Sequence, residues 1–445
     1  MIYFLILLSY ALIAINFGAP LRVSNIPDVL VVLEHTLVLY LCHGIVKRHF
    51  HDTKNRRRYY VFFLVSYCIS ILYLYTEWGD KLFNTFSTGW DAFDPIKYYS
   101  MAAVSIKNGY LFEDMKMFPV SFVYYVIMKI FGMNPLVPLF FNEVVFVYAI
   151  CILTKYMNTN TPQHLKYYSW LLLIPEVICY NVTSSKDILC CLCATIVFVK
   201  SATFLKKGIS RHDIFILAFF FIILVLARTS LAMASVCGVL LMAIFSRRLS
   251  KKQILLIGVA LSMAVGVFVL SSGRDSSADN IANNVEAQVS GDVTGAAQLN
   301  GQSANSFAQK IIPHNTVEYI VFGFIRSICY VVIDPRFIKA PLTTMLPMDG
   351  LTMLICVDYT TLVMCIASVY IFFWLLRKYK KEDDYVKDVF LIVALYWYAV
   401  GTFNPMMIHV RYRIVYDIFF FAIAIRAYLM RKKNKKRVFD NTCLS

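Results

Sequence analysis

Apolar residues occur in long unbroken blocks, and this feature most restricts the folds open to the chain. The blocks near 28–46, 137–154, 187–205 and 213–228 approach the length of a helix that crosses about 30 Å of hydrocarbon. Of the 445 residues, 59% are hydrophobic and 16% are charged. A soluble domain carries about 25% charged residues. The sequence therefore predicts an integral membrane protein.

Positive charge is concentrated in short clusters between the apolar blocks. The net charge is +16 at pH 7, and more than half of the lysines and arginines fall in residues 47–58, 206–211, 247–252, 377–381 and 431–437. The excess of basic residues in cytoplasmic loops accounts for such clusters. No basic stripe is interleaved with aromatic residues. Nucleic acid is therefore not expected as a partner, whereas membrane lipids are.

The expected fold is all-α, a polytopic transmembrane helical bundle of about twelve spans with in-plane helices in its outer loops. The first span carries no positive residue at its start, so we interpret it as an uncleaved helix rather than a signal peptide. All basic clusters then face one side, which predicts a multi-pass protein of the cytoplasmic (inner) membrane with both termini cytoplasmic. The spans are placed near 2–17, 28–46, 59–76, 137–154, 167–183, 187–205, 213–228, 230–246, 253–270, 351–376, 387–403 and 413–430.

No hydrophilic linker divides the spans, so we expect one domain over residues 1–445. Two long segments, 77–136 and 271–350, face outward in this arrangement. Eight of the twelve cysteines lie within spans, where thiols act as small packing residues, so no disulfide framework is expected. Cys190 and Cys193 have CxxC spacing, but no histidine or second pair accompanies them.

The outer segment 77–136 contains two expected helices. Residues 100–108 form a helical stretch that Gly109 ends. The apolar piece 119–131 is too short to span, so it is expected to lie along the membrane surface. Its anchors at headgroup depth would be Tyr124, Tyr125 and Lys129.

The outer segment 271–350 divides into two parts. Residues 271–305 are rich in Ser, Asn, Ala, Gln and Gly and hold no aromatic residue, so 271–316 is expected to be flexible. Residues 317–333 are apolar but include two charges, which favours an interfacial or re-entrant helix.

Several charged residues fall at the outer ends of spans, where ionisable groups cost a few kcal/mol. These are Lys186, Asp187, Arg228, Arg411 and Arg413. Each basic residue taken alone is equally well explained as an anchor at a helix end. Together, basic and acidic residues gathered on one face favour a polar outer cavity, in which a guanidinium would suit a phosphate group.

The order of several motifs resembles the C-type membrane glycosyltransferases, the superfamily that takes sugars from polyprenyl-phosphate carriers. The resemblance covers roughly residues 59–205 and 400–430, although two extra spans precede the aspartate loop where the family usually has one. The matching motifs are, in order, an outer-loop aspartate followed by a tyrosine, an in-plane helix ending in Phe-Gly, a span ending in proline, and a late Arg-Tyr-Arg. The residues that match are Asp94, Tyr98, Ala102, Gly109, Pro119, Phe131, Gly132, Pro175, Ser184, Asp187, Arg411, Tyr412 and Arg413.

The resemblance implies an enzyme that transfers a sugar or oligosaccharide from a polyprenyl-(di)phosphate carrier to a glycan or lipid-linked acceptor, in cell-surface polysaccharide biosynthesis. A neighbouring interpretation is a repeat-unit polymerase of the O-antigen, capsule or exopolysaccharide type. A third, from another class, is a transporter or flippase for lipid-linked oligosaccharide, which would also need a basic outer cavity. Transporters, however, tend to show internal repeats and broken midplane helices, which the sequence does not reveal.

Sugar transfer needs a base and a stabilised leaving phosphate. Asp94 is the first choice of general base, with Asp91 as the substitute. Asp94 is equally well placed as the N-cap of the helix that follows. Asp187 would orient the donor or hold a divalent metal, although no dense carboxylate cluster demands one and no other cofactor is expected. The leaving phosphate would be stabilised by Arg411, Arg413, Arg228 and Lys186.

Two aromatic residues of the first outer segment, Trp90 and Tyr98, are assigned to substrate binding. Both would stack on sugar faces, and headgroup anchoring is an equally good interpretation.

The late arginines give a first testable prediction. Replacing Arg411 or Arg413 with Ala should abolish product formation in a cell-based glycan assay while leaving the amount of protein unchanged. Lys should restore activity poorly, because an ammonium group cannot reproduce the planar fork of a guanidinium. Full activity in both single variants and in the double variant would remove these residues from the mechanism.

Overall fold

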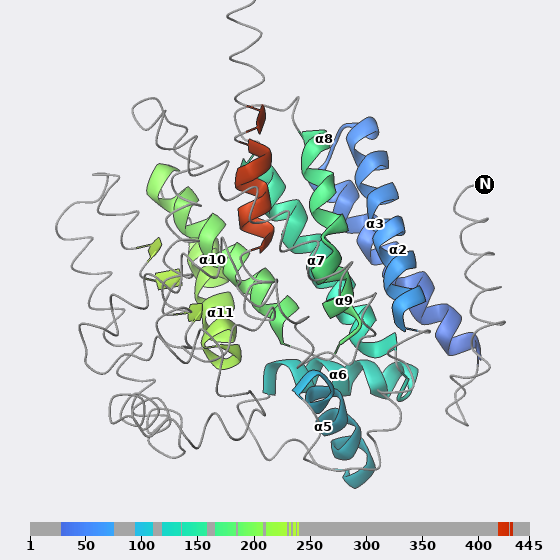
Figure 1. Ribbon diagram of the computed structural model, residues 1–445. Coiled ribbons are helices and arrows are strands. Elements are labelled where there is room, and N and C mark those ends of the chain that lie inside the picture. The colour runs from blue at the N-terminus through green and yellow to red at the C-terminus, as the bar shows by residue number, and fades with distance from the viewer. Residues whose placement is uncertain are drawn as a thin grey trace, which may run out of the picture.

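The fold is known from a computed structural model, and every described element in it is a helix (Figure 1). The order along the chain is α2, α3, α5, α6, α7, α8, η6, α9, α10 and α11, followed by a C-terminal helix. The structure describes residues 28–74, 94–109, 118–134, 136–157, 165–183, 186–207, 211–228, 231–232, 235–236, 238–239, 417–426 and 428–429. The spans expected near 2–17, 253–270, 351–376 and 387–403, and the segment 271–350, lie outside these residues.

Helices α2 (Asp28–His49) and α3 (Thr53–Tyr73) form a hairpin whose turn is set by local sequence. Asp52 caps α3, since its carboxylate accepts hydrogen bonds of 3.2 Å from the backbone N–H groups of Lys54 and Asn55. The ring of Phe50 packs at 4.2 Å from that of Tyr59, which fixes the direction of the returning chain.

Helix α7 (Leu136–Met157) lies in the centre of the bundle, and α10 (Asp187–Lys207) packs beside it (Figure 1). Both are long and apolar enough to cross a membrane. Helix α7 contacts α2, α6, α9 and α10 and is apolar around nearly its whole circumference, the pattern of a helix that is buried on all sides. Helix α11 (Arg211–Ala227) returns antiparallel beside α10.

The segment expected as one span near 167–183 is not a continuous helix. It divides into α8 (Leu165–Tyr168), the 3₁₀ helix η6 (Ser169–Leu173) and α9 (Pro175–Asn181). The break falls at Ile174, whose backbone is extended with φ −69° and ψ 112°. Pro175 causes it, because proline lacks an N–H and disfavours helical geometry in the residue before it. A proline fits instead as the first residue of a new helix.

Two helices lie across one end of the bundle, at the bottom of Figure 1. These are α5 (Asp94–Asn108) and α6 (Phe118–Phe131), and they pack against each other. The expected helices over 100–108 and 119–131 are thus confirmed, as is the stop at Gly109, which has φ +73°. Tyr124 is not an exposed anchor as expected, since its side chain is fully buried against Phe141.

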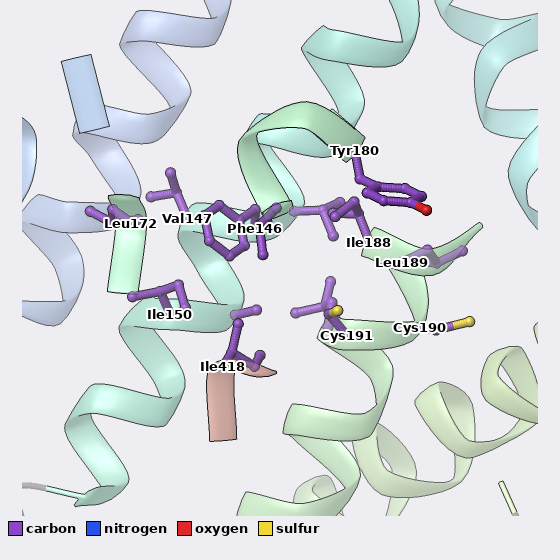
Figure 2. Close-up of a cluster of buried hydrophobic side chains, with 14 of the residues drawn as sticks. Phe146, Val147, Ile150, Leu172, Tyr180, Ile188, Leu189, Cys190, Cys191 and Ile418 are labelled. Carbon is purple, nitrogen blue, oxygen red and sulfur yellow. The ribbon is translucent and has the colours of Figure 1, made fainter. Parts of the chain in front are cut away.

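The apolar core is centred where α7, α9, α10 and the C-terminal helix (residues 417–426) meet (Figure 2). Phe146 and Ile150 of α7 face Ile188 and Cys191 of α10, with Ile418 between the two helices (Figure 2). Among the described residues the free thiols are Cys42, Cys68, Cys151, Cys190, Cys191 and Cys193.

Two glycines make a matched test of the backbone. Gly44 lies within α2 and Gly109 ends α5 at positive φ, and an added Cβ meets no atom within 4 Å at either position. Gly44→Ala should raise the free energy of unfolding by about 0.5–1 kcal/mol through helix propensity. Gly109→Ala should lower it by about 1–2 kcal/mol through left-handed strain. Thermal midpoints of the two purified variants should move in opposite directions, and a shift of the same sign in both would contradict these backbone assignments.

Candidate functional site

A buried ion pair joins the beginning of α10 to the end of α11. The guanidinium Nη2 of Arg228 lies 2.5 Å from Oδ1 of Asp187, and the two side chains are 6% and 0% exposed. Asp187 is the first residue of α10, and Arg228 directly follows the last residue of α11. Each charge therefore lies at the favourable end of its own helix dipole, the anion at the N-terminus and the cation at the C-terminus.

A third charge lies close to this pair. Asp417, the first described residue of the C-terminal helix, is fully buried. The thiol of Cys191, one turn after Asp187 in α10, interacts electrostatically with Asp187, Arg228 and Asp417. The C-terminal helix packs along the same side of α10, where the ring of Phe419 lies 5.7 Å from that of Phe198. Chain segments about 200 residues apart thus bring three charges together.

The connection that leads into Asp187 is held by a buried amide. Nδ2 of Asn142 in α7 donates to the carbonyl oxygens of Asn181 at 2.9 Å and Thr183 at 2.8 Å. The Asn181 carbonyl is the last of α9, where a helix leaves its final acceptors without partners inside the helix, and the Thr183 carbonyl lies two residues beyond it. Asn142 therefore fixes where α9 ends and, through it, where α10 begins.

Further buried polar contacts join α2, α3, α5 and α7. Oγ of Ser70 donates to Oε1 of Glu143 at 2.8 Å, and Nδ2 of Asn134 donates to Oε2 of Glu34 at 2.9 Å. The hydroxyl of Tyr99 donates to the Asn134 carbonyl at 3.0 Å, and burial raises the pKa of that phenol well above its usual range. His35 of α2 and Tyr67 of α3 share a buried hydrogen bond of 2.8 Å. We call the whole set the polar belt: Glu34, His35, Tyr67, Ser70, Tyr99, Asn134, Asn142, Glu143, Asp187 and Arg228.

The helices that lie across the end of the bundle meet the ion pair through one tyrosine. The fully buried phenol of Tyr124 in α6 lies near Asn142 of α7, Tyr98 of α5 and Asp187 of α10. Tyr98 lies one helical turn after the first residue of α5. The first turns of α5 and of α10 therefore both lie near Tyr124 of α6.

The residues expected at a substrate site have different positions in the structure. Asp94 is the first residue of α5, and Lys186 is partly exposed beside Asp187. Tyr98 is only 5% exposed and packs in the core, so it offers little surface for stacking on a sugar. Asp187 and Arg228 are buried against each other rather than open to solvent. Outside the described residues lie Trp90, Asp91, Arg411 and Arg413.

The sequence reasoning missed three buried carboxyl groups. Glu34, Glu143 and Asp417 each lie within a segment expected to span the membrane, and their side chains are at most 1% exposed. Their position in the sequence could have indicated them, because an acidic residue inside a long apolar block is rare and usually has a function. In the described part of the chain, no group of three or more His, Cys, Asp or Glu side chains is arranged to hold a metal ion.

Comparison with known proteins gives no relative: no family model, curated protein or solved structure matches the chain.

The ion pair generates a stability prediction. Arg228→Met or Asp187→Asn should lower the free energy of unfolding by about 3–5 kcal/mol, because each removes one member of a buried ion pair. The double variant should lose less than the sum of the two. The control is Lys200→Met, because Lys200 pairs with Asp213 where each side chain is 33% exposed. This substitution should lower the free energy of unfolding by less than about 1 kcal/mol. Equal midpoint shifts in thermal unfolding for Arg228→Met and Lys200→Met would contradict the importance of burial.

Proposed function

We propose that the chain is a polytopic membrane glycosyltransferase of the cytoplasmic membrane. It transfers a sugar or oligosaccharide from a polyprenyl-(di)phosphate carrier to a glycan or lipid-linked acceptor on the outer face. The observation that carries the proposal is the meeting of α5, which begins at Asp94, with the buried charges Asp187 and Arg228 through Tyr124. Both kinds of group that sugar transfer requires, a carboxylate and a guanidinium, thus come from neighbouring elements.

Exposed apolar faces support the membrane part of the proposal. Helix α11 exposes Phe215 by 70% and Ile222 by 57%, and α3 exposes Ile69 by 45%. Such faces on a soluble chain would be an aggregation hazard, whereas hydrocarbon covers them at no cost. Together with the two helices α7 and α10, they support a bundle that lipid surrounds.

The reaction follows from the chemistry of the donor. The acceptor hydroxyl attacks C1 of the sugar, a new C1–O bond forms, and the bond from C1 to the carrier phosphate breaks with the electron pair leaving on the phosphate. The carboxylate of Asp94 takes the hydroxyl proton. Positive charge from Arg228, with Arg411, Arg413 and Lys186, stabilises the leaving phosphate. Asp187 fits this scheme as the group that holds the Arg228 guanidinium in place.

A lipid-linked oligosaccharide transporter is the second candidate, and one observation favours it. The broken segment α8, η6 and α9 is the kind of discontinuous helix that transporters use at their substrate sites. Transport would move the intact lipid-linked glycan across the membrane without breaking a glycosidic bond. A repeat-unit polymerase shares the transfer chemistry and would differ in its product, a ladder of chain lengths instead of one addition.

Asp94→Asn is the decisive test. Loss of a general base should reduce transfer about 10²–10⁴-fold in membranes supplied with lipid-linked donor, and the donor should accumulate in cells. Asn caps a helix about as well as Asp, so a merely structural Asp94 should tolerate the change.

Asp52→Asn is the matched control. Asp52 is the N-cap of α3 at the opposite end of the bundle, so the same substitution there should leave transfer unchanged. Wild-type turnover in Asp94→Asn would exclude Asp94 as the general base. Asp91 and Asp187 would then be the remaining candidates for that role. Translocation of the intact lipid-linked glycan by the wild-type protein, with no cleavage of the donor, would instead select the transporter.

A further inference from the structure

A basic surface is formed at the end of the bundle opposite α5 and α6 (Figure 1). It is the place where α2 ends, α3 begins, α7 ends and α8 begins. Its exposed side chains are Lys47, Arg48, Lys54, Arg57, Lys155 and Lys166. We call this the basic end.

Specific contacts hold these four helix ends together. The Tyr59 hydroxyl donates to the Leu165 carbonyl at 2.9 Å and to Oγ1 of Thr154 at 3.3 Å, which ties α3 to α8 and α7. Nε of Arg58 donates to Oγ of Ser169 at 3.2 Å, which adds η6. The charges of the basic end are therefore fixed on a packed framework rather than carried by a loop.

The two sequence segments that form the basic end contain little negative charge. Asp52 is the one acidic residue in 47–58, and its carboxylate is bonded to two backbone N–H groups as the α3 cap. Residues 154–173 contain no acidic residue. Like charges gathered at one end of the bundle repel one another, so a bound anion would reduce that repulsion.

A stripe along α3 indicates what kind of anion fits. Arg57, Val61, Val65 and Ile69 recur every four residues and so lie on one face of the helix. The three apolar members are exposed by 47%, 44% and 45%, and the exposed Arg57 stands at the head of the stripe. A cation followed by exposed apolar residues that extend over about 12 Å of helix matches a phosphate headgroup with an acyl chain below it.

An aromatic pair borders the basic end at the depth where headgroups would lie. The Trp170 side chain is 55% exposed and packs edge-on against Phe62 at 5.0 Å, while the Arg58 guanidinium lies 5.3 Å above the Phe62 ring. Tryptophan in such a position is typical of the membrane–water interface. A soluble phosphate or a polyanion would explain the charges but not the apolar stripe.

We infer that the basic end is a binding site for an anionic phospholipid, with the phosphate held by Lys54 and Arg57 and an acyl chain lying along Val61, Val65 and Ile69 of α3. The inference requires a membrane-embedded chain but not the sugar-transfer reaction. Basic surfaces on the cytoplasmic side of helical membrane proteins bind anionic headgroups by the same attraction.

The test compares two lipids with identical acyl chains on the full-length protein in detergent. Phosphatidylglycerol should raise the thermal midpoint by roughly 2–5 °C more than phosphatidylcholine. Native mass spectrometry should show phosphatidylglycerol retained. The double variant Lys54→Gln/Arg57→Gln should weaken that binding roughly tenfold to thirtyfold, since two headgroup contacts are lost.

The control is Lys107→Gln/Lys129→Gln, which removes two exposed lysines from α5 and α6 at the other end and should bind phosphatidylglycerol like wild type. Equal binding of both lipids, or equal weakening in the two double variants, would overturn the site, since charge at any position would then suffice. The same stabilisation by inorganic phosphate alone would overturn the assignment to a lipid. Unchanged phosphatidylglycerol binding in Lys54→Gln/Arg57→Gln would overturn the site as well. Another segment of the chain would then be expected to cover the apolar stripe of α3.

Discussion

The buried pair of Asp187 and Arg228 is the interaction on which the arrangement of α10 and α11 depends. A single charge at this depth would cost several kcal/mol, so the two helices can pack only where the beginning of one is level with the end of the other. Lys200 and Asp213 form a second ion pair at the opposite end of the same hairpin. The register of α10 against α11 is therefore set at both ends, while apolar packing between them sets only their distance.

The same reasoning extends to α7 through the polar belt. A helix that is apolar on all sides has no preferred rotation, because any face packs about equally well against its neighbours. Asn142 and Glu143 remove that freedom, since one must face the end of α9 and the other must face Ser70 of α3. Directional hydrogen bonds thus determine which apolar faces of the helices pack together, and the large buried apolar area stabilises that packing.

The sequence predicted those features that depend on local pattern. The helices α5, α6, α7 and α10 follow from block length and periodicity, and the stop at Gly109 follows from glycine chemistry. Hydropathy averaged over a window could not register Pro175, which divides the segment 167–183 although its neighbours are apolar. The burial of Tyr98 and Tyr124, and the approach of Asp417 to Asp187, depend on which helices pack together and so leave no trace in local sequence.

The polar belt also bears on the choice between transfer and transport. Alternating access requires helices to move against one another, which would break contacts that cross between helices in each cycle. The bonds from Ser70 to Glu143 and from Asn142 to the end of α9 are of this kind, and breaking a buried bond leaves its groups unsatisfied at about 1–3 kcal/mol each. Sugar transfer makes the opposite demand, since charges that are already in position need not reorganise as the phosphate leaves. Buried polar contacts that stay fixed around Asp187 and Arg228 therefore favour the proposed sugar transfer over transport. In this interpretation the helix break at Pro175 positions the end of α9 for its hydrogen bonds to Asn142.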